Sequence, residues 1–203
     1  AVRSGMATAW GTSEWSAQQI TEAVWTARTL GLEPPQFEQP QYNMLHRARV
    51  ESEYAPLFQA PYNLGLTTWS PLCSGLLTGK YNTSTPSGSR ATLPGYEWLV
   101  TLFDKQRAEG AIERIGALTE YAAETFDCSM TQLALAWCVK NPNVTTVLLG
   151  ATKTEQLEEN LGCLSVVERM TDEHMTAIGA LLDNAPEPSS GYGGAGMRRL
   201  VTI

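Results

Sequence analysis

The chain has 203 residues, of which 43% are hydrophobic, and its formal net charge is −7. This length allows one domain or at most two, and the apolar content argues against disorder. The acidic balance excludes a fold-wide basic surface for nucleic acid, but not a local basic pocket. The longest apolar run, residues 133–139, is far too short to span a bilayer.

The cysteines and histidines argue against a metal site. The four cysteines are at positions 73, 128, 138 and 163 without a Cys-x-x-Cys pair, and the histidines are His46 and His174. A zinc cluster is therefore not expected. The pattern is typical of reduced thiols in a cytoplasmic protein rather than of a disulfide framework.

The first predicted unit is a short strand over residues 6–10 followed by a helix. Ser16 is a candidate N-cap of this helix, and Gln19 completes a capping box three residues later. Gly31 is the expected C-terminal stop. Apolar residues at helical spacing define one buried face: Ile20, Ala23, Val24 and Ala27.

Three further strands are predicted over residues 36–39, 64–69 and 144–149. With the first strand they give four strand–helix units, and short strands alternating with amphipathic helices indicate a parallel sheet in an α/β fold. Four such units form either half of an eight-stranded barrel or a small open sheet, and periodicity does not separate the two.

The remaining helices are predicted from apolar periodicity. Pro56 is expected to kink or divide the first of them, and Ser129 with Gln132 forms a second capping box. These helices cover residues 48–59, 105–124, 130–139, 154–161 and 171–183.

The loop after the third strand, residues 70–81, is the first candidate for ligand binding. Ser70 and Ser74 offer hydroxyl groups, and Gly75 allows a close approach of the backbone to a ligand. Lys80 supplies a point charge suited to a phosphate. The alternative is an ordinary strand-to-loop turn rich in Ser and Gly.

The turn after the fourth strand is the second candidate. Gly150 ends the strand and Thr152 precedes a helix whose N-terminus can bind an anion. The alternative is simple capping of that helix by Thr152 or Thr154. In (β/α)₈ barrels a phosphate often lies on the loops after the last two strands, which is where both candidates occur. No Gly-x-Gly-x-x-Gly dinucleotide signature is present.

Other polar and aromatic residues leave two interpretations open. Arg90 is either a phosphate ligand or a solvated surface residue, and Trp69 is either a stacking platform or a core residue. Taken without a ligand, Glu159 and Asn160 belong to a solvated helix face. For both histidines a non-catalytic position is favoured, and no Gly-x-Ser-x-Gly motif is present.

Four motifs, taken together, resemble the aldo-keto reductases, and most closely their voltage-gated potassium channel β-subunit branch. The resemblance covers about residues 2–185, and it leaves residues 186–203 as a tail with the composition of a flexible linker. The motifs are Trp10-Gly11-Thr12-Ser13, Glu38-Gln39-Pro40-Gln41-Tyr42, Trp69-Ser70-Pro71-Leu72 and Leu149-Gly150-Ala151-Thr152 with Gln156, Glu159 and Asn160.

The resemblance implies a (β/α)₈ barrel, represented here by about its last four units, that binds NADP(H) in an extended pose. Ser13 and Gln39 would contact the nicotinamide amide, and Trp69 would stack on its ring. The pyrophosphate region would be held by Ser70, Leu72, Ser74 and Lys80, with Pro71 in the same motif. The adenosine and its 2′-phosphate would be surrounded by Arg90, Thr152, Gln156, Glu159 and Asn160, next to Gly150. Gly88 departs from the pattern, which often has an aromatic residue beside the adenine, and Thr152 stands where Ser is usual.

The resemblance also implies that the first four strands, with the catalytic Asp, Tyr and Lys of the family, lie outside these 203 residues. We therefore expect no catalytic residue in this chain, two open sheet edges, and either self-association or completion by an upstream segment. Three functions stay open: the cofactor-binding half of a reductase acting on small carbonyl substrates, a channel-subunit-like module that binds NADP(H), and a truncated, inactive product.

Overall fold

A four-stranded parallel sheet is the central feature of the computed structural model, which describes residues 1–188. Its strands are β1 (Gly11–Ser13), β2 (Phe37–Gln39), β3 (Gly65–Thr68) and β4 (Val144–Val147), and they lie in the order β1-β2-β3-β4. This confirms the α/β class with a parallel sheet. Neighbours in space are also consecutive in the chain, which is the arrangement of strands in part of a (β/α)₈ barrel.

The helical segments differ in number between the connections. The β1–β2 connection holds α1 (Ala17–Thr29), and the β2–β3 connection holds a π-helical turn (Arg49–Glu53) and a 3₁₀ turn (Ala55–Phe58). The β3–β4 connection holds two 3₁₀ segments (Cys73–Thr78, Arg90–Thr92), α2 (Glu97–Ala108), α3 (Ala111–Phe126) and α4 (Met130–Lys140). After β4 come α5 (Thr154–Leu161), α6 (Cys163–Arg169) and α7 (Asp172–Leu182).

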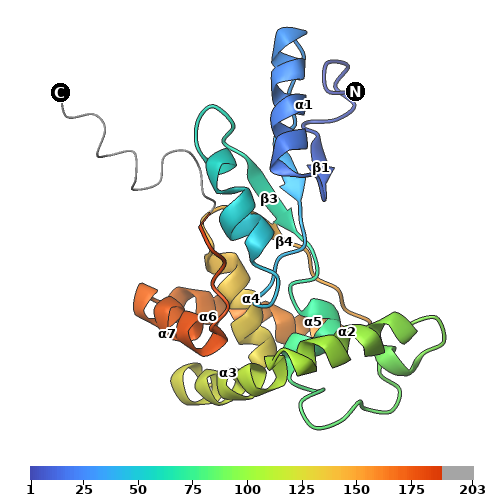
Figure 1. Ribbon diagram of the computed structural model, residues 1–203, viewed down its shortest axis with the longest axis vertical. Coiled ribbons are helices and arrows are strands. Elements are labelled where there is room, and N and C mark those ends of the chain that lie inside the picture. Colours follow the sequence, from blue (N-terminus) through green and yellow to red (C-terminus); the bar gives the residue numbers. More distant parts are fainter. Residues whose placement is uncertain (189–203) are drawn as a thin grey trace.

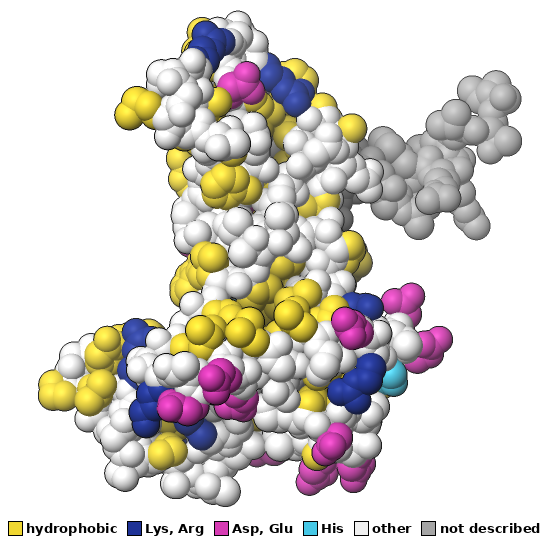
Figure 2. Space-filling model, turned by 180° about the vertical axis from the view of Figure 1, so that it is seen from behind, with side chains coloured by type: hydrophobic (Ala, Val, Ile, Leu, Met, Phe, Trp, Pro, Cys, Tyr) yellow, Lys and Arg dark blue, Asp and Glu magenta, His cyan; other side chains and the backbone are white. Residues whose placement is uncertain are grey.

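The molecule is elongated (Figure 1), with β1 and α1 at one end of its long axis and α2, α3, α6 and α7 toward the other. The opposite view (Figure 2) shows hydrophobic side chains gathered across the middle of that face, between the two ends. Among the described residues, none of the helices combines the length and apolarity needed to cross a bilayer.

The core is centred on α4. Eight of its eleven residues are buried, because the helix is apolar on nearly all sides and packs against β4, α3, α5 and α6. Trp137 on α4 stacks on Tyr42 with ring centroids 5.1 Å apart, which ties the helix to the loop after β2. This packing fixes the position of the loops at the end of the sheet.

Both capping boxes expected from the sequence are confirmed. Ser16 accepts a hydrogen bond from the Gln19 backbone N–H, and Ser129 accepts one from Gln132, while each Gln side chain bonds back to its N-cap backbone. Gly31 follows α1 with φ of +63°, as the expected stop requires. Each of these helix-end signals involves residues only a few positions apart, and each is present in the structure.

The strand expected over residues 6–10 is wrong, because β1 covers Gly11–Ser13 and the preceding residues form no strand. Met6 contributes to the apolar pattern but is 84% exposed. Gly11, which follows the expected strand, pairs with Phe37, and a Cβ at Gly11 would overlap the Phe37 carbonyl oxygen and ring. The missing side chain therefore permits this strand pairing rather than ending it.

The helix expected over residues 105–124 is also wrong, because two helices replace it. Gly110 adopts φ of +73° and separates α2 from α3. The helix α6 was not predicted. The helix expected over residues 48–59 is divided at Tyr54, and Pro56 lies in the first turn of its second part, where a missing N–H costs nothing.

Hydrogen bonds hold the end of the described chain against the segment after β2. Asn184 donates from Nδ2 to the Met44 carbonyl oxygen over 2.8 Å and accepts a bond from Arg47 Nη1 over 2.9 Å. Ser52 Oγ donates to the Glu187 carbonyl oxygen over 2.6 Å. We call residues 183–188 the C-terminal strap. The predicted flexible tail of residues 186–203 lies mostly outside the described residues.

Candidate functional site

The carboxyl ends of the four strands bring several of the predicted site residues to one edge of the sheet. Ser13 pairs in register with Gln39, and its Oγ donates to the Gln39 carbonyl oxygen over 3.0 Å. Trp69 forms a parallel bridge with Gln41, directly after β3. The Leu148 N–H donates to the Thr68 carbonyl oxygen over 2.8 Å, so the two candidate loops begin at adjacent strand ends.

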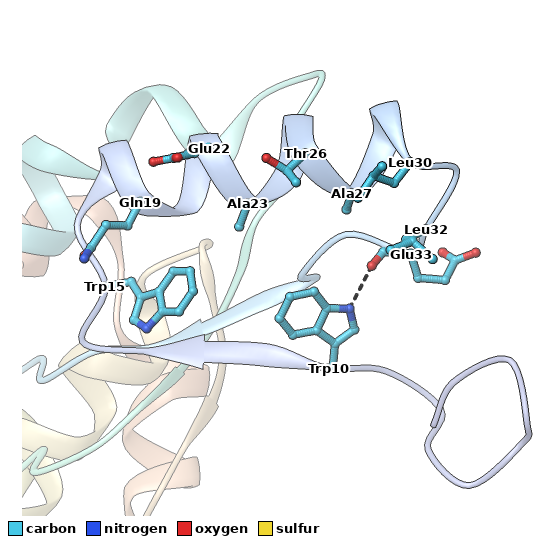
Figure 3. A pocket seen from close by; sticks show the side chains of 10 residues that line it. All are labelled: Trp10, Trp15, Gln19, Glu22, Ala23, Thr26, Ala27, Leu30, Leu32 and Glu33. Atoms are coloured by element: carbon cyan, nitrogen blue, oxygen red, sulfur yellow. Dashed lines mark hydrogen bonds between the residues drawn. The ribbon is translucent and has the colours of Figure 1, made fainter.

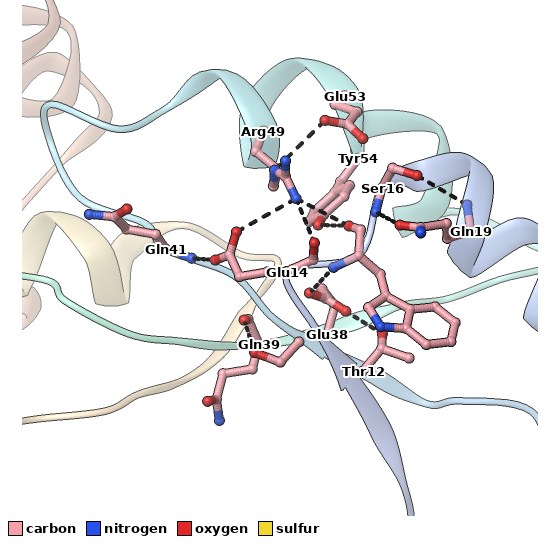
Figure 4. Close-up of polar contacts among 12 residues, drawn as sticks. Thr12, Glu14, Ser16, Gln19, Glu38, Gln39, Gln41, Arg49, Glu53 and Tyr54 are labelled. Carbon is pink, nitrogen blue, oxygen red and sulfur yellow. Dashed lines mark hydrogen bonds and ion pairs between the residues drawn. The ribbon is translucent and has the colours of Figure 1, made fainter.

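Glu14 lies at this edge of the sheet, directly after β1 (Figure 4). It was not predicted as a site residue. It adopts φ of +59°, and its Oε1 accepts hydrogen bonds from the Gln41 backbone N–H (2.6 Å) and from Trp69 Nε1 (2.8 Å). Arg49 Nη1 lies 3.6 Å from Glu14 Oε2. One carboxylate thus links β1, the segment after β2 and the indole at the end of β3. We call it the Glu14 clamp.

A second carboxylate, Glu38, is fully buried behind the strand ends. It accepts a hydrogen bond from the Thr12 hydroxyl and one from the Trp15 backbone N–H over 3.1 Å. Burial raises the pKa of Glu38 above its usual value, and the two hydrogen bonds oppose that rise. Its partners belong to β1 and to the turn before α1, so Glu38 links β2 to both of these segments.

The loop after β3 has an unusual backbone. Ser70, Cys73, Ser74 and Gly75 have φ values of +54°, +48°, +55° and +96°, although three of them carry side chains. The Ser74 N–H donates to Ser70 Oγ over 3.3 Å, and Asn43 Nδ2 donates to the Ser70 carbonyl oxygen over 2.9 Å. Strained backbone of this kind concentrates at binding sites. The backbone N–H groups of Cys73 and Gly75 donate to the Ser70 and Leu72 carbonyl oxygens, so the loop is closed by its own hydrogen bonds.

Lys80 lies above this loop. Its Nζ would be 3.4 Å from a Cβ placed on Gly75, and it lies 5.0 Å from the centre of the Tyr81 ring. Cys73 in the same loop is buried, and burial raises the pKa of its thiol to about 12, so it offers no thiolate at neutral pH. The loop therefore offers the Lys80 ammonium group and serine hydroxyl groups rather than a thiolate.

Unpartnered polar atoms follow in the next segment. The Tyr81 hydroxyl, Asn82 Oδ1 and Ser89 Oγ are buried without a hydrogen-bond partner among the described residues. Arg90, directly after Ser89, places its guanidinium over the Tyr96 ring at 4.6 Å. A buried polar atom without a partner in the protein is suited to a bond from a ligand or a water molecule. Hydroxyl groups beside an Arg and a Lys suit a phosphate group, so the residues present fit the cofactor that the resemblance implies.

The residues after Gly150 form their own local contacts. Thr152 donates from its backbone N–H (2.8 Å) and from Oγ1 (3.1 Å) to Gln156 Oε1. The N-cap of α5 is Lys153 and makes no side-chain cap, so the alternative of capping by Thr152 or Thr154 is wrong. Glu159 accepts from Ser129 Oγ over 2.9 Å, and Asn160 is buried. The Glu159 carboxylate is thus directed to the N-terminus of α4.

The remaining site residues flank these groups. Pro71 is buried and Leu72 is half-buried at the start of the strained loop. A hollow of about 470 Å³ lies next to the Glu14 clamp and is lined by residues that include Gln41, His46, Arg49 and Asn184. Burial lowers the pKa of His46, so this ring is neutral at pH 7. Within residues 1–188 no group of three His, Cys, Asp or Glu side chains is placed to hold a metal ion.

Sequence reasoning missed Glu14, Ser89 and Asn82. Ser89 could have been found from its position beside Arg90, since small hydroxyl residues often accompany a phosphate-binding Arg. Glu14 gave no signal, because its partners Gln41 and Trp69 are 27 and 55 residues away in the chain.

Comparisons with known proteins agree with the motifs. The model of the aldo/keto reductase family matches residues 1–183. A rice protein (Oryza sativa subsp. japonica) named "Probable voltage-gated potassium channel subunit beta" is 46% identical over 189 residues, which is 93% of this chain and 56% of the rice protein. An Arabidopsis thaliana protein of the same name is 42% identical over the same shares. The chain thus spans little more than half the length of these curated relatives.

Proposed function

Because the chain belongs to the aldo/keto reductase family, we propose that it is the NADP(H)-binding part of a protein that reduces small aldehydes or ketones. The observation that carries the proposal is the strained loop after β3, which lies at the carboxyl edge of the sheet with Lys80 above it. The chain covers 56% of its relatives, so the reaction itself is proposed for a whole protein and not for these residues alone.

The nicotinamide end of the cofactor is assigned to Ser13, Gln39 and Trp69. Ser13 and Gln39 are neighbours on β1 and β2. Ser13 Oγ donates to the backbone carbonyl oxygen of Gln39, so this bond does not involve the Gln39 side-chain amide. Trp69 is 37% exposed and held at its Nε1 by Glu14, so its indole is available for stacking. These are orienting roles, because none of the three offers an acid for the carbonyl oxygen.

The pyrophosphate is assigned to the strained loop. Ser70, Leu72 and Ser74, with Pro71 between the first two, would surround it, and Lys80 would supply the charge. The Ser70 and Ser74 hydroxyl groups can donate hydrogen bonds to phosphate oxygens. Left-handed backbone at three non-glycine residues is compatible with a binding role for the loop.

The adenosine and its 2′-phosphate are assigned to Arg90 and to the segment after Gly150 that contains Thr152, Gln156, Glu159 and Asn160. Arg90 is preorganised by stacking on Tyr96, and Ser89 beside it has an unpartnered hydroxyl. In this structure Glu159 Oε1 accepts a hydrogen bond from Ser129, and the second carboxylate oxygen would be the one to accept from the adenosine.

When bound, the nicotinamide supplies a hydride to a carbonyl carbon. This chain would bind and orient the cofactor at the strand ends. We assign it no catalytic acid, because Tyr42 and Tyr54 are buried and their hydroxyl groups already donate to Glu51 and to the Trp15 carbonyl oxygen. The proton would come from a residue outside this chain.

The test is a titration of the purified chain with NADPH and NADH, followed by quenching of tryptophan fluorescence. We expect saturable binding with a preference for NADPH, and we expect Arg90→Ala to remove that preference while Arg107→Ala, an exposed control on α2, keeps it. Binding of neither nucleotide, or an Arg90→Ala chain that still prefers NADPH, would contradict the assignment.

A second candidate function, an auxiliary subunit of a membrane channel in the cytoplasm, is favoured by the names of the two relatives. The four free cysteines are compatible with a reducing compartment. Co-purification of the full-length protein with the cytoplasmic domain of a potassium channel would support this function, and a clean negative would count against it.

A further inference from the structure

A tight turn over residues 43–47 connects the strained loop after β3 with the C-terminal strap. Asn43 forms an antiparallel bridge with His46, and their backbones exchange hydrogen bonds of 3.0 and 3.4 Å. Asn43 Oδ1 also accepts from the N–H groups of Leu45 (2.9 Å) and His46 (3.0 Å). One side-chain oxygen therefore fixes the shape of the turn, which is a bonding pattern that Asn favours. We call residues 43–47 the Asn43 turn.

The nitrogen end of the same side chain supports the strained loop. Asn43 is fully buried, and its Nδ2 donates to the Ser70 carbonyl oxygen over 2.9 Å. Ser70 keeps φ of +54°, and left-handed backbone at such a residue persists only where surrounding contacts hold it. Ser70 Oγ in turn accepts from the Ser74 N–H over 3.3 Å. A shift of the Ser70 backbone would therefore displace both serine hydroxyl groups of the loop.

The C-terminal strap holds the Asn43 turn at two further points. Asn184 Nδ2 donates to the Met44 carbonyl oxygen over 2.8 Å, and Arg47 Nη1 donates to Asn184 Oδ1 over 2.9 Å. Met44 directly follows Asn43, so Asn184 fixes the backbone from which the Asn43 side chain extends. Hydrogen bonds thus run without a gap from the strap through the turn to the loop, and contiguous networks of this kind can carry coupling between sites.

We propose that Asn43 is a positioning residue for the strained loop, and that the C-terminal strap acts on cofactor binding through it. This rests on the proposed function, which takes the loop as the pyrophosphate site. Asn43 itself does not touch the cofactor; it holds the Ser70 backbone, and with it the hydroxyl groups of Ser70 and Ser74. Docking of the strap and binding of NADPH then favour the same loop conformation, so each strengthens the other.

Asn43→Asp isolates the contact with Ser70. The carboxylate still accepts from the Leu45 and His46 N–H groups, and these two bonds favour its ionised form. An ionised carboxylate has no hydrogen to donate to the Ser70 carbonyl oxygen. The Kd of the protein for NADPH, measured by isothermal titration calorimetry, should rise about fivefold, which is the equivalent of one net hydrogen bond of about 1 kcal/mol.

Asn141→Asp is the matched control for this substitution. Asn141 Oδ1 accepts from the Asn143 N–H over 3.0 Å, and its Nδ2 donates to the Tyr42 hydroxyl over 3.0 Å. The change therefore removes an amide donor of the same kind while an acceptor for a backbone N–H is kept. No bond to the strained loop is lost, so the Kd for NADPH should stay at the wild-type value.

Asn184→Ala tests the action of the strap. It removes both bonds between Asn184 and the Asn43 turn, and the Kd for NADPH should rise about threefold. In a chain with both Asn184→Ala and Asn43→Asp, the contact that transmits the effect is already absent. The Kd should then stay about fivefold above wild type, whereas independent actions would multiply to about fifteenfold.

Arg28→Ala is the control for the loss of an exposed bond to a backbone carbonyl group. Arg28 Nη2 donates to the Pro61 carbonyl oxygen over 2.6 Å. It lies on α1, which forms one wall of a separate hollow of about 490 Å³ (Figure 3). None of the residues that line this hollow belongs to the strap, the Asn43 turn or the strained loop. Arg28→Ala should therefore bind NADPH like the wild type.

The loop gives a second readout that needs no cofactor. The Gly75 N–H donates to the Leu72 carbonyl oxygen within the strained loop, so the Gly75 amide resonance should move in Asn43→Asp and in Asn184→Ala, but in neither control.

The outcomes separate this proposal from the proposed function. A wild-type protein that does not bind NADPH contradicts both. Wild-type binding together with an unchanged Kd in Asn43→Asp, or with a fifteenfold loss in the double variant, overturns the positioning role alone. Should Asn43→Asp not fold, an Asn184→Ala protein with the wild-type Kd and an unmoved Gly75 resonance overturns it equally.

Discussion

The Glu14 clamp predicts that Glu14→Ala weakens cofactor binding without unfolding the chain. Glu14 Oε1 is the acceptor for Trp69 Nε1 and for the Gln41 N–H, at 2.8 and 2.6 Å. Its ion pair with Arg49 joins two side chains about 40% exposed, so it contributes about 0–1 kcal/mol to stability. Water can replace both hydrogen bonds at this exposed edge, and the net loss per bond is then about 1 kcal/mol.

The effect on binding comes from the indole. If the nicotinamide stacks on Trp69 as proposed, a released indole must be immobilised again, which costs about 0.5–1.5 kcal/mol for one side chain. That cost corresponds to an NADPH Kd about 2- to 13-fold higher, since about 1.4 kcal/mol is tenfold. The Kd is measured by fluorescence titration, and the Trp69 indole N–H resonance reports the loss of its acceptor directly.

Glu14→Gln separates this explanation from a general structural one. The amide oxygen of Gln still accepts a hydrogen bond from Trp69, so the variant should restore most of the affinity although it loses the Arg49 pair. The reasoning is refuted if Glu14→Ala shifts the Trp69 resonance while the Kd stays at the wild-type value. It is refuted equally if Glu14→Gln binds as weakly as Glu14→Ala.

Three further predictions concern stability, each measured as the free energy of unfolding in urea. Ser129→Ala should lose about 1 kcal/mol, because it removes the N-cap of α4 and the bond to Glu159, whereas Ser165→Ala, which lacks a capping role, should lose less. Gly11→Ala should lose more than Gly116→Ala, since a Cβ at Gly11 overlaps Phe37 and one at Gly116 meets open space; equal losses would contradict the packing argument. Because burial raises the folded-state pKa of Glu38, its proton is held more tightly in the folded chain, so stability should fall as pH rises from about 4.5 through that pKa. Glu38→Gln should lack this fall, and an unchanged pH profile in the variant would assign it to another group.

Local signals in the sequence predict much of the fold, and tertiary contacts explain the rest. The capping boxes at Ser16 and Ser129 involve residues three apart, so the sequence contains all of their geometry. The break at Gly110 was missed because the apolar periodicity continues across it. The strand at Gly11 was misplaced because its pairing partner, Phe37, lies 26 residues later in the chain.

The candidate site also contains some residues that local sequence indicates and others that only tertiary contacts reveal. Ser70, Ser74, Gly75 and Lys80 are close in sequence, and their composition alone indicates an anion-binding loop. The left-handed backbone of Ser70 is instead supported from outside the loop, by Asn43 donating to its carbonyl oxygen. The Glu14 clamp joins three strand ends, and no short motif records such a contact. Candidate binding residues can thus be proposed from motifs more readily than the residues that position them.

The C-terminal strap has a consequence for synthesis of the protein. Asn184 contacts Met44 and Arg47, and Glu187 contacts Ser52, across separations of 135–140 residues. Contacts of such long range form late, because the intervening chain must first be ordered. On the ribosome the segment that carries His46 and Arg49, beside the candidate site, has no partner for these bonds until residue 187 has emerged. A nascent chain therefore lacks these hydrogen bonds between the segment after β2 and the strap until nearly all of the described residues have been made.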